Sequence, residues 1–264
     1  MSEDRKYNFR VLHTINYNLF DKICDAVNSY EVKINRLANK ELRLQLDRHN
    51  FKINDNKVET KFERLAHEYN KTLFPVLFDV KEGNFSLANY TEISERIAQK
   101  DLELKLKHEG SGFDYIRDNF LEKVAKDGYT MAKYFYSFGL IRIILLCLKK
   151  IENNPDYSFH WQAIPIASDV FWKGKKDFNP ESKILKYEGN SHRNQELFEK
   201  IKGYGNAYQY PEKVTDEESV ITTTIRHETQ YITTALDFEF SETEIKISNS
   251  YFNYEETFAI NRKY

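Results

Sequence analysis

The sequence predicts an α+β fold in which antiparallel β-sheets from the N- and C-terminal parts pack around a central three-helix segment. Residues 1–88 and 152–264 contain many short stretches in which apolar and polar residues alternate, the pattern of half-buried strands. Residues 89–151 carry helical spacing instead and end in the most apolar run of the chain. Because neither β-rich part has a second layer of its own, we expect a single domain over residues 1–264.

The N-terminal part is β-rich, and its clearest strand is Glu41–Arg48. Three leucines take every second position of this stretch, with polar residues between them, so one face is apolar and the other polar. Further strands are expected over residues 7–15, 30–37, 74–80 and 85–88. Residues 57–65 continue the strand pattern less clearly, and their spacing also permits a short helix over residues 63–69.

The central part is expected to form three helices, over residues 89–108, 113–126 and 129–151. Asn89 or Thr91 can cap the first helix, and a glycine pair ends it. The third helix is the apolar run. It contains no proline, is longer than an ordinary strand, and has lysines near its end.

The second half of the third helix, from Phe138 to Leu148, is apolar nearly all round, and such a helix must be enclosed. Its uninterrupted apolar part, Gly139–Leu148, is shorter than the ~20 residues that cross a bilayer, and it contains Arg142. We therefore expect no membrane span and a helix wrapped by the chain's own sheets. Arg142 is then either buried with carboxylate or carbonyl partners or extended to the surface. The sequence leaves these two positions open.

The C-terminal part returns to strands and closes with the clearest β pattern of the chain. Strands are expected over residues 159–166, 170–172, 184–187, 219–225, 230–240, 243–248 and 255–260. Short connections between the last of these favour an antiparallel meander. A short helix is expected over residues 195–202, followed by a surface loop over residues 203–218.

The composition is that of a folded protein with a substantial core, since 41% of the 264 residues are hydrophobic and 15% are aromatic. The polar, charged start of the chain lacks the apolar segment of a secretory signal, so we expect a cytoplasmic protein. Cys24 and Cys147 should remain free thiols in that compartment. Frequent Asn, Lys, Ile and Tyr indicate an AT-rich bacterial or phage genome.

The net charge of −2 is unevenly distributed along the chain. Residues 211–264 contain eleven Asp or Glu and five Lys or Arg, and so carry −6, which leaves +4 for the remainder. An acidic C-terminal sheet argues against binding to nucleic acid, and the positive excess elsewhere is too small to argue for it. We therefore expect no nucleic-acid partner.

Several signatures of common enzymes are missing or incomplete. The sequence contains no P-loop and no nucleophile elbow, and Gly203–Tyr208 lacks the third glycine of a dinucleotide-binding motif. His227–Tyr231 begins like the HExxH motif of zinc proteases, but Tyr231 replaces the second histidine, and we expect a polar turn between strands. The seven histidines are scattered without metal-ligand spacing, so no metal site and no cofactor is expected.

Asp237, Glu244 and Lys246 are the weak candidates for a catalytic site. An aspartate on one strand and Glu-x-Lys on the next is typical of metal-dependent nucleases, in which carboxylates hold Mg²⁺ and the lysine polarises the attacking water. A solvated strand face also explains Glu244 and Lys246, and the surrounding acidic charge would repel DNA. The solvated face is the favoured interpretation.

Aromatic residues supply the candidates for an interface. Trp161 and Trp172 flank an apolar segment. Core packing is the first explanation for both, and an interface anchor is the alternative. Tyr204, Tyr208 and Tyr210 lie in the predicted surface loop, where exposed aromatic side chains would suit a protein partner.

No known family has motifs that match the chain, so the function is expected from its features alone. We expect a non-catalytic cytosolic protein that binds another protein, as an assembly or adaptor component or as an inhibitor or immunity-type binder. The first alternative is a carrier or sensor of an apolar ligand, in a cavity lined by Phe135, Phe138, Ile141 and Leu145. The second alternative is a metal-dependent nuclease-like hydrolase.

Overall fold

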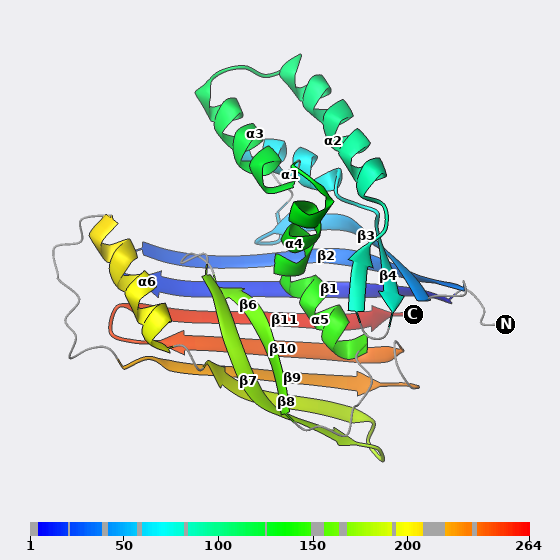
Figure 1. Ribbon diagram of the computed structural model, residues 1–264, viewed down its shortest axis with the longest axis vertical. Coiled ribbons are helices and arrows are strands. Elements are labelled where there is room, and N and C mark those ends of the chain that lie inside the picture. Colours follow the sequence, from blue (N-terminus) through cyan, green and yellow to red (C-terminus); the bar gives the residue numbers. More distant parts are fainter. Residues whose placement is uncertain are drawn as a thin grey trace. The chain divides into compact units, whose positions relative to one another are not determined.

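The computed structural model describes residues 5–20, 22–38, 42–56, 60–81, 84–124, 126–148, 156–163, 168–191, 194–207, 220–233 and 237–264. Its strands (Figure 1) are β1 (Arg5–Leu19), β2 (Lys22–Ala38), β3 (Leu42–Ile53), β4 (Val76–Lys81), β5 (Asn84–Leu87), β6 (Asp156–Ala163), β7 (Ser168–Asn179), β8 (Ile184–Ser191), β9 (Thr222–Tyr231), β10 (Phe238–Ser248) and β11 (Phe252–Lys263). Its helices are α1 (Lys61–Lys71), α2 (Tyr90–Lys105), α3 (Ser111–Val124), α4 (Gly128–Ser137), α5 (Gly139–Leu148) and α6 (Asn194–Ala207).

The strands are hydrogen-bonded in the order β5-β4-β3-β2-β1-β11-β10-β9-β8-β7-β6. The pairs β2–β3, β3–β4, β8–β9, β9–β10 and β10–β11 are all antiparallel. Since β9, β10 and β11 are neighbours both in the sequence and in the sheet, the predicted C-terminal meander is confirmed. The α+β class with antiparallel β-structure is confirmed with it.

The chain divides into two compact units. The first unit consists of Met1–Val11, Asn28–Tyr136 and Arg262–Tyr264, and the second of Leu12–Val27 and Ser137–Asn261. The long strands β1 and β2 contribute residues to both units. Each unit has its own set of buried apolar side chains.

Helix α1 of the first unit begins at a complete capping box. The Glu63 N–H donates to Thr60 Oγ1 at 3.2 Å, and the Thr60 N–H donates to Glu63 Oε2 at 3.1 Å. The helix buries Leu65 and Tyr69, and the Tyr69 hydroxyl donates to Asp101 of α2 at 2.9 Å. A second face of α1 carries polar side chains, and this face becomes one wall of the site described below.

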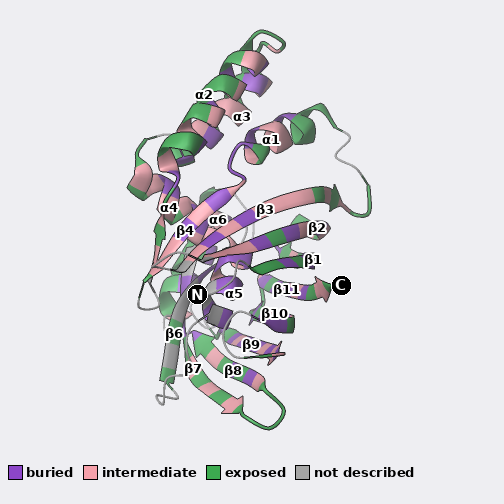
Figure 2. Cartoon of the chain, turned by 90° about the vertical axis from the view of Figure 1, so that its right-hand side faces the viewer, coloured by how far each residue is buried: buried purple, intermediate pink, exposed green. Residues whose placement is uncertain are grey.

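In the second unit, α5 lies against β10 and β6. Buried and exposed residues alternate along β9, β10 and β11, as expected for strands with one face in a core (Figure 2). The buried face of β9 includes His227 and Thr229. The core of this unit therefore contains polar groups beneath the most apolar helix of the chain.

The apolar run forms two helices, so the prediction of one helix is wrong. Helix α4 ends at Ser137 and α5 begins at Gly139. A Cβ on Gly139 would lie 2.6 Å from Phe258 and 2.7 Å from Trp161, so the position requires glycine, which weakens a helix. The described residues of the helical centre therefore form four helices, α2 to α5, in place of three. In the part of the chain that the structure describes, no helix is long and apolar enough to span a membrane.

Two predictions near residue 230 are also wrong. The segment 230–240, expected as one strand, contains the end of β9 and the start of β10. Between these strands the Ile232 N–H donates to the Asp237 carbonyl oxygen at 2.8 Å. The segment 227–231, expected as a polar turn, lies within β9. Its inward residues are polar, so the sequence did not show the apolar alternation of a buried strand face.

Candidate anion-binding site

Arg48 is a charged residue on an otherwise apolar face of β3 in the first unit. Side chains alternate along a strand, so Arg48 shares its face with Leu44 and Leu46, which are only 0% and 1% exposed. The backbone of Arg48 pairs with that of Val32 on β2. The strand therefore holds this cation at the margin of the core, where it is half-buried.

Three aromatic rings surround the Arg48 guanidinium. Its Cζ lies 5.9 Å from the ring centre of Tyr30, 5.1 Å from that of Phe51 and 4.8 Å from that of Phe74. Each cation–π contact of this kind contributes about 0.5–1 kcal/mol or more. The rings do not replace a carboxylate as an in-plane acceptor for the N–H groups of the guanidinium.

A β-bulge brings Phe51 to the same side of β3 as Arg48. Residues three positions apart on a regular strand point to opposite faces. Here the pairing of β2 with β3 shifts register between Ser29 and Glu31, and Asn50 has a positive φ of 54°. The irregular backbone therefore allows Arg48 and Phe51 to line one cavity.

Arg48 makes no hydrogen bond or ion pair within the described part of the chain. Burial lowers the pKa of its guanidinium, and Tyr30 and Tyr134 oppose this shift. Arginine nevertheless stays protonated in proteins. A charge that is partly removed from water without a counter-ion raises the free energy of the folded chain. The environment of Arg48 therefore favours an added anion.

Arg48 lines a cavity of about 290 Å³, here called the inner cavity. Other side chains of its lining are His49, Phe51, His67, Lys71 and Phe74. The acidic residue of the lining, Asp47, has its Oδ2 3.0 Å from His49 Nε2. The inner cavity is therefore rich in cations and N–H donors.

Helix α1 supplies the second wall of the site. Arg64, His67, Glu68 and Lys71 have the spacing i, i+3, i+4, i+7, so they lie on one helix face. This face lines a larger cavity of about 670 Å³, here called the outer cavity. The opposite wall includes Arg10, Tyr30, Glu31, Phe51 and Lys52. Because His67 and Phe51 line both cavities, the two cavities adjoin.

His67 lies where the two cavities meet. Its ring stacks on Phe51, with centroids 5.4 Å apart and an interplanar angle of 22°. Burial lowers the pKa of His67, the positive charges of Lys71 and Arg48 lower it further, and Glu68 opposes them. The imidazole is therefore mainly uncharged at neutral pH, and an anion bound beside it would favour its protonation.

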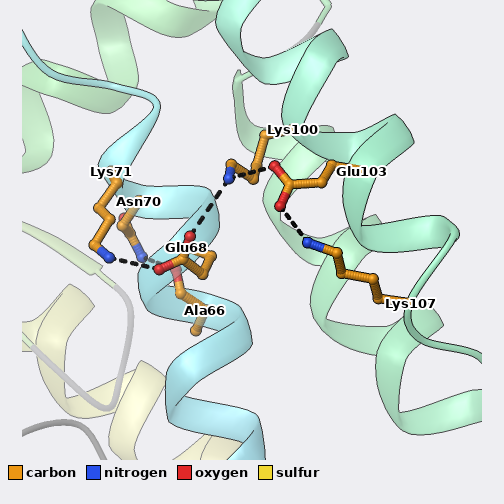
Figure 3. A network of polar contacts seen from close by, with 7 residues as sticks. All are labelled: Ala66, Glu68, Asn70, Lys71, Lys100, Glu103 and Lys107. Atoms are coloured by element: carbon orange, nitrogen blue, oxygen red, sulfur yellow. Dashed lines mark hydrogen bonds and ion pairs between the residues drawn. The ribbon is translucent and has the colours of Figure 1, made fainter.

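The acidic residues Glu68 and Glu31 of the outer cavity already have cationic partners. Glu68 Oε1 lies 2.5 Å from Lys71 Nζ, and its Oε2 lies 3.5 Å from Lys100 Nζ (Figure 3). These contacts lower the pKa of Glu68 against the opposing effect of burial. The Lys263 ammonium and the Asn50 amide donate to Glu31 in the same way. Neither carboxylate is available to neutralise Arg48.

Three other basic residues of the outer cavity lack such partners. The side chains of Arg10, Lys52 and Arg64 are exposed, and none forms a hydrogen bond or ion pair in the described ranges. Asp55 is the remaining acidic residue of the lining. Uncompensated positive charge therefore exceeds uncompensated negative charge around the two cavities, which favours anionic ligands.

The structure separates Asp237 from the other two catalytic candidates of the sequence. Asp237 precedes β10 and is buried, and Thr233 Oγ1 donates to it at 3.2 Å. Glu244 and Lys246 lie further along β10. At ~3.3 Å per residue, Glu244 is about 23 Å from Asp237. Lys246 Nζ lies 2.7 Å from Glu244 Oε1 in an ion pair on the strand face. In the described part of the chain, no group of three His, Cys, Asp or Glu residues could hold a metal ion.

Both tryptophans lie in the core of the second unit and form no exposed patch. Trp161 is 3% exposed and Trp172 is 0% exposed. Trp161 Nε1 donates to Glu256 Oε2 at 2.6 Å, and the Tyr254 hydroxyl donates to the same oxygen at 2.6 Å. His13 Nε2 lies 2.8 Å from Glu256 Oε1. Trp161 therefore helps to satisfy a buried carboxylate, a role that sequence alone does not reveal.

The tyrosine cluster is described only in part. Tyr204 lies in α6, because this helix continues to Ala207, into the segment expected as a loop. Lys22 Nζ donates to the Tyr204 hydroxyl at 2.9 Å. Tyr208 and Tyr210 lie outside the described residues.

The residues expected around an apolar cavity are packed where they are described. Phe135 is buried in the first unit, with edge-to-face contacts to Phe74 and Phe78 at 6.3 and 5.9 Å. Ile141 is buried in the second unit, Phe138 is half-buried, and the side chain of Leu145 lies outside the description. On the same helix, α5, Arg142 is half-buried and its Nε is shielded from solvent.

Arg48 was not predicted as a site residue, although the sequence contains a signal for it. The stretch Glu41–Arg48 alternates apolar and polar residues, and Arg48 occupies the next position of the apolar set. A buried network on β9 and β10, in which both ring nitrogens of His227 have hydroxyl partners, was not predicted either. The network is internally satisfied, so it forms part of the core, whereas Arg48 is left without an acidic partner among the described residues.

Comparisons with known proteins show no family for this chain. No family model matches it, and no curated protein matches it in sequence. A solved structure entitled "Lipid-protein interactions in lipovitellin" is similar at 8% identity and a TM-score of 0.46, over 99% of this chain and 25% of that chain. A crystal structure of the CurJ dehydratase aligns at 8% identity and a TM-score of 0.11, over 97% of this chain and 76% of that chain. This chain thus spans a quarter of the length of the lipovitellin chain.

Proposed function

We propose that the chain is a non-catalytic binding protein that holds a small organic anion at Arg48, in the inner cavity. The observation that carries this proposal is a half-buried arginine among three rings, with no acidic partner in the described part of the chain. A bound carboxylate or phosphate would supply the missing counter-ion. Charge-assisted hydrogen bonds of this kind are among the strong interactions of proteins.

Isothermal titration calorimetry with sulfate tests the proposal. Sulfate should bind the unmodified chain, and Arg48→Gln should weaken binding at least tenfold, or by about 1.4 kcal/mol. A hydrogen bond to a charged group contributes about 1.5–3 kcal/mol, so this loss is the minimum expected. Lys33→Gln removes one exposed positive charge from β2 in the same unit and should leave the affinity unchanged.

Equal sulfate affinity in the Arg48→Gln and Lys33→Gln variants would contradict the proposal, because binding would then reflect general surface charge. Far-ultraviolet circular dichroism of both variants verifies that each is folded before the affinities are compared.

A second candidate function is binding to another protein, as expected from the sequence. Exposed apolar side chains of the first unit favour it: Leu102 on α2 is 65% exposed, Leu106 at the end of α2 is 88% exposed, and Tyr115 on α3 is 70% exposed. We expect a specific protein to co-purify from the native host and to be lost when Leu106 and Tyr115 are both replaced by serine. Retention of the same protein by that double variant would count against this surface.

We also propose a cytoplasmic location. Its support is chemical, since Cys24 and Cys147 are both free thiols. Free cysteines are the rule in reducing compartments.

A further inference from the structure

The inner cavity is lined by more donors than a carboxylate can use. Arg48 and His67 both contribute N–H groups, and neither side chain has a hydrogen-bond partner in the described part of the chain. Lys71 adds a positive charge, although its ammonium is bonded to Glu68. A carboxylate offers two oxygens, whereas a phosphate monoester offers three strong acceptor oxygens and up to two negative charges. The lining therefore matches a phosphate group better.

The outer cavity adds a wall of rings. Tyr30 and Phe51 have centroids 6.0 Å apart at 35°, and Phe51 and His67 have centroids 5.4 Å apart at 22°. All three side chains line the outer cavity, and two of them continue into the inner one. Flat rings stack favourably on such a surface. An aromatic ring attached to the phosphate could therefore stack on the aromatic side chains of the outer cavity.

The volumes suit one small molecule that occupies both cavities. The inner cavity of about 290 Å³ accommodates a phosphate group, and the outer cavity of about 670 Å³ lies within the range of small-molecule sites. Arg10, Lys52 and Arg64 add positive charge around the outer cavity, which increases the attraction for an anion that approaches from solvent.

We propose, on the basis of the function proposed above, that the ligand is a soluble phosphate monoester with a flat aromatic body. The phosphate lies in the inner cavity against Arg48 and His67, and the aromatic body lies in the outer cavity against Phe51. The Arg48 guanidinium provides paired N–H donors for the phosphate. His67, which lines both cavities, lies beside the junction of the phosphate and the aromatic ring.

Isothermal titration calorimetry at pH 8 with three probes tests this ligand class on the unmodified chain. The probes are inorganic phosphate, phenyl phosphate and benzoate, and at this pH the phosphate groups are mainly doubly charged. Phenyl phosphate should bind about tenfold more tightly than inorganic phosphate, because only it can stack on Phe51. It should also bind more tightly than benzoate, which has the ring but only a singly charged, two-oxygen group.

Two variants assign the probe contacts to residues. Phe51→Leu should reduce the affinity for phenyl phosphate towards that for inorganic phosphate and leave the affinity for inorganic phosphate nearly unchanged. Arg48→Gln should weaken both phosphate probes, and Lys33→Gln neither. Because the comparison of probes on the unmodified chain needs no substitution, the test stands even where a variant is unstable.

The outcomes separate the ligand class from the function on which it rests. Equal affinities for phenyl phosphate and inorganic phosphate would contradict the proposal that the ligand has an aromatic body. Equal affinities for benzoate and phenyl phosphate would contradict the proposal that its anionic group is a phosphate. Absence of binding by all three probes would overturn the anion-binding function itself. Sedimentation of the chain with vesicles that contain phosphatidic acid tests a lipid source instead. Co-sedimentation that is lost in Arg48→Gln would contradict a soluble ligand and would assign the phosphate to a lipid headgroup.

Discussion

His227 is a titratable residue in the core of the second unit, and each of its ring nitrogens has a hydroxyl partner. Its Nδ1 lies 2.8 Å from Thr243 Oγ1 and its Nε2 lies 2.8 Å from Thr229 Oγ1. Thr229 Oγ1 lies in turn 2.9 Å from Ser241 Oγ. Burial lowers the pKa of His227 to about 3, because protonation would place a charge in the core. The folded chain therefore keeps this imidazole neutral over most of the pH range.

The neutral state of His227 predicts a pH dependence of stability. The unfolded chain binds a proton at the ordinary histidine pKa of 6.5, whereas the folded chain does not until about pH 3. The contribution of His227 is therefore complete above about pH 6.5 and is lost as the pH falls towards 3, by up to about 1.4 kcal/mol per pH unit. Urea unfolding of the unmodified chain and of His227→Gln should show that their difference in unfolding free energy shrinks over this window. A difference that stays constant between pH 7 and pH 4 would contradict the buried neutral imidazole.

Arg48 predicts a stability effect of a different kind. Arg48→Met should lower the unfolding free energy by no more than about 1 kcal/mol, because the lost cation–π contacts are offset by removal of a partly buried charge. Methionine can also pack against the same rings. Arg117→Met is the matched control. It should cost about 1–3 kcal/mol, because Arg117 Nε donates to Asp101 at 2.7 Å and the loss leaves that carboxylate short of a partner.

Urea unfolding monitored by circular dichroism measures both arginine variants. A loss of about 3 kcal/mol or more in Arg48→Met would assign Arg48 to the maintenance of the fold, and would contradict an arginine held for a ligand.

At the scale of elements, the junction of α4 and α5 depends on a single small residue. Gly139→Ala should lower the unfolding free energy by about 1–3 kcal/mol, because the added Cβ would lie 2.6 Å from the buried ring of Phe258. Gly203→Ala on α6 is the matched control, since a Cβ there meets nothing within 4 Å. It should raise stability by about 0.5–1 kcal/mol through helix propensity. Thermal unfolding distinguishes the two, and equal effects would contradict the close packing at residue 139.

The elements that the sequence predicted well are those whose pattern is local. The alternation of leucines in Glu41–Arg48 corresponds to β3, and α2 starts directly after Asn89, as predicted. The Asn89 side chain does not cap the helix, because its Oδ1 accepts from the Leu77 N–H at 2.9 Å.

The predictions failed where contacts between residues distant in sequence determine the secondary structure. The run expected as one helix is divided at Phe138, beside Gly139, where an added Cβ would meet two rings distant in sequence. The second half of β9 was expected as a turn because its inward residues His227 and Thr229 are polar.

At the scale of the whole molecule, the candidate site depends on residues that the sequence keeps apart. The cavities combine β1, β2, β3 and α1, from Arg10 to Phe74. A register shift in the β2–β3 pair places Phe51 beside Arg48, and period-two alternation predicts the reverse. The absence of an acidic partner for Arg48 in the described residues is likewise visible only in three dimensions. The sequence therefore predicted the strand that carries Arg48 and not the pocket.

A crystal structure determined in the presence of phenyl phosphate would show most directly where the ligand binds. We expect tetrahedral electron density within hydrogen-bond distance of the Arg48 guanidinium, with the phenyl ring against Phe51. Density confined to exposed lysines, or a carboxylate of the chain itself bound to Arg48, would contradict this binding site.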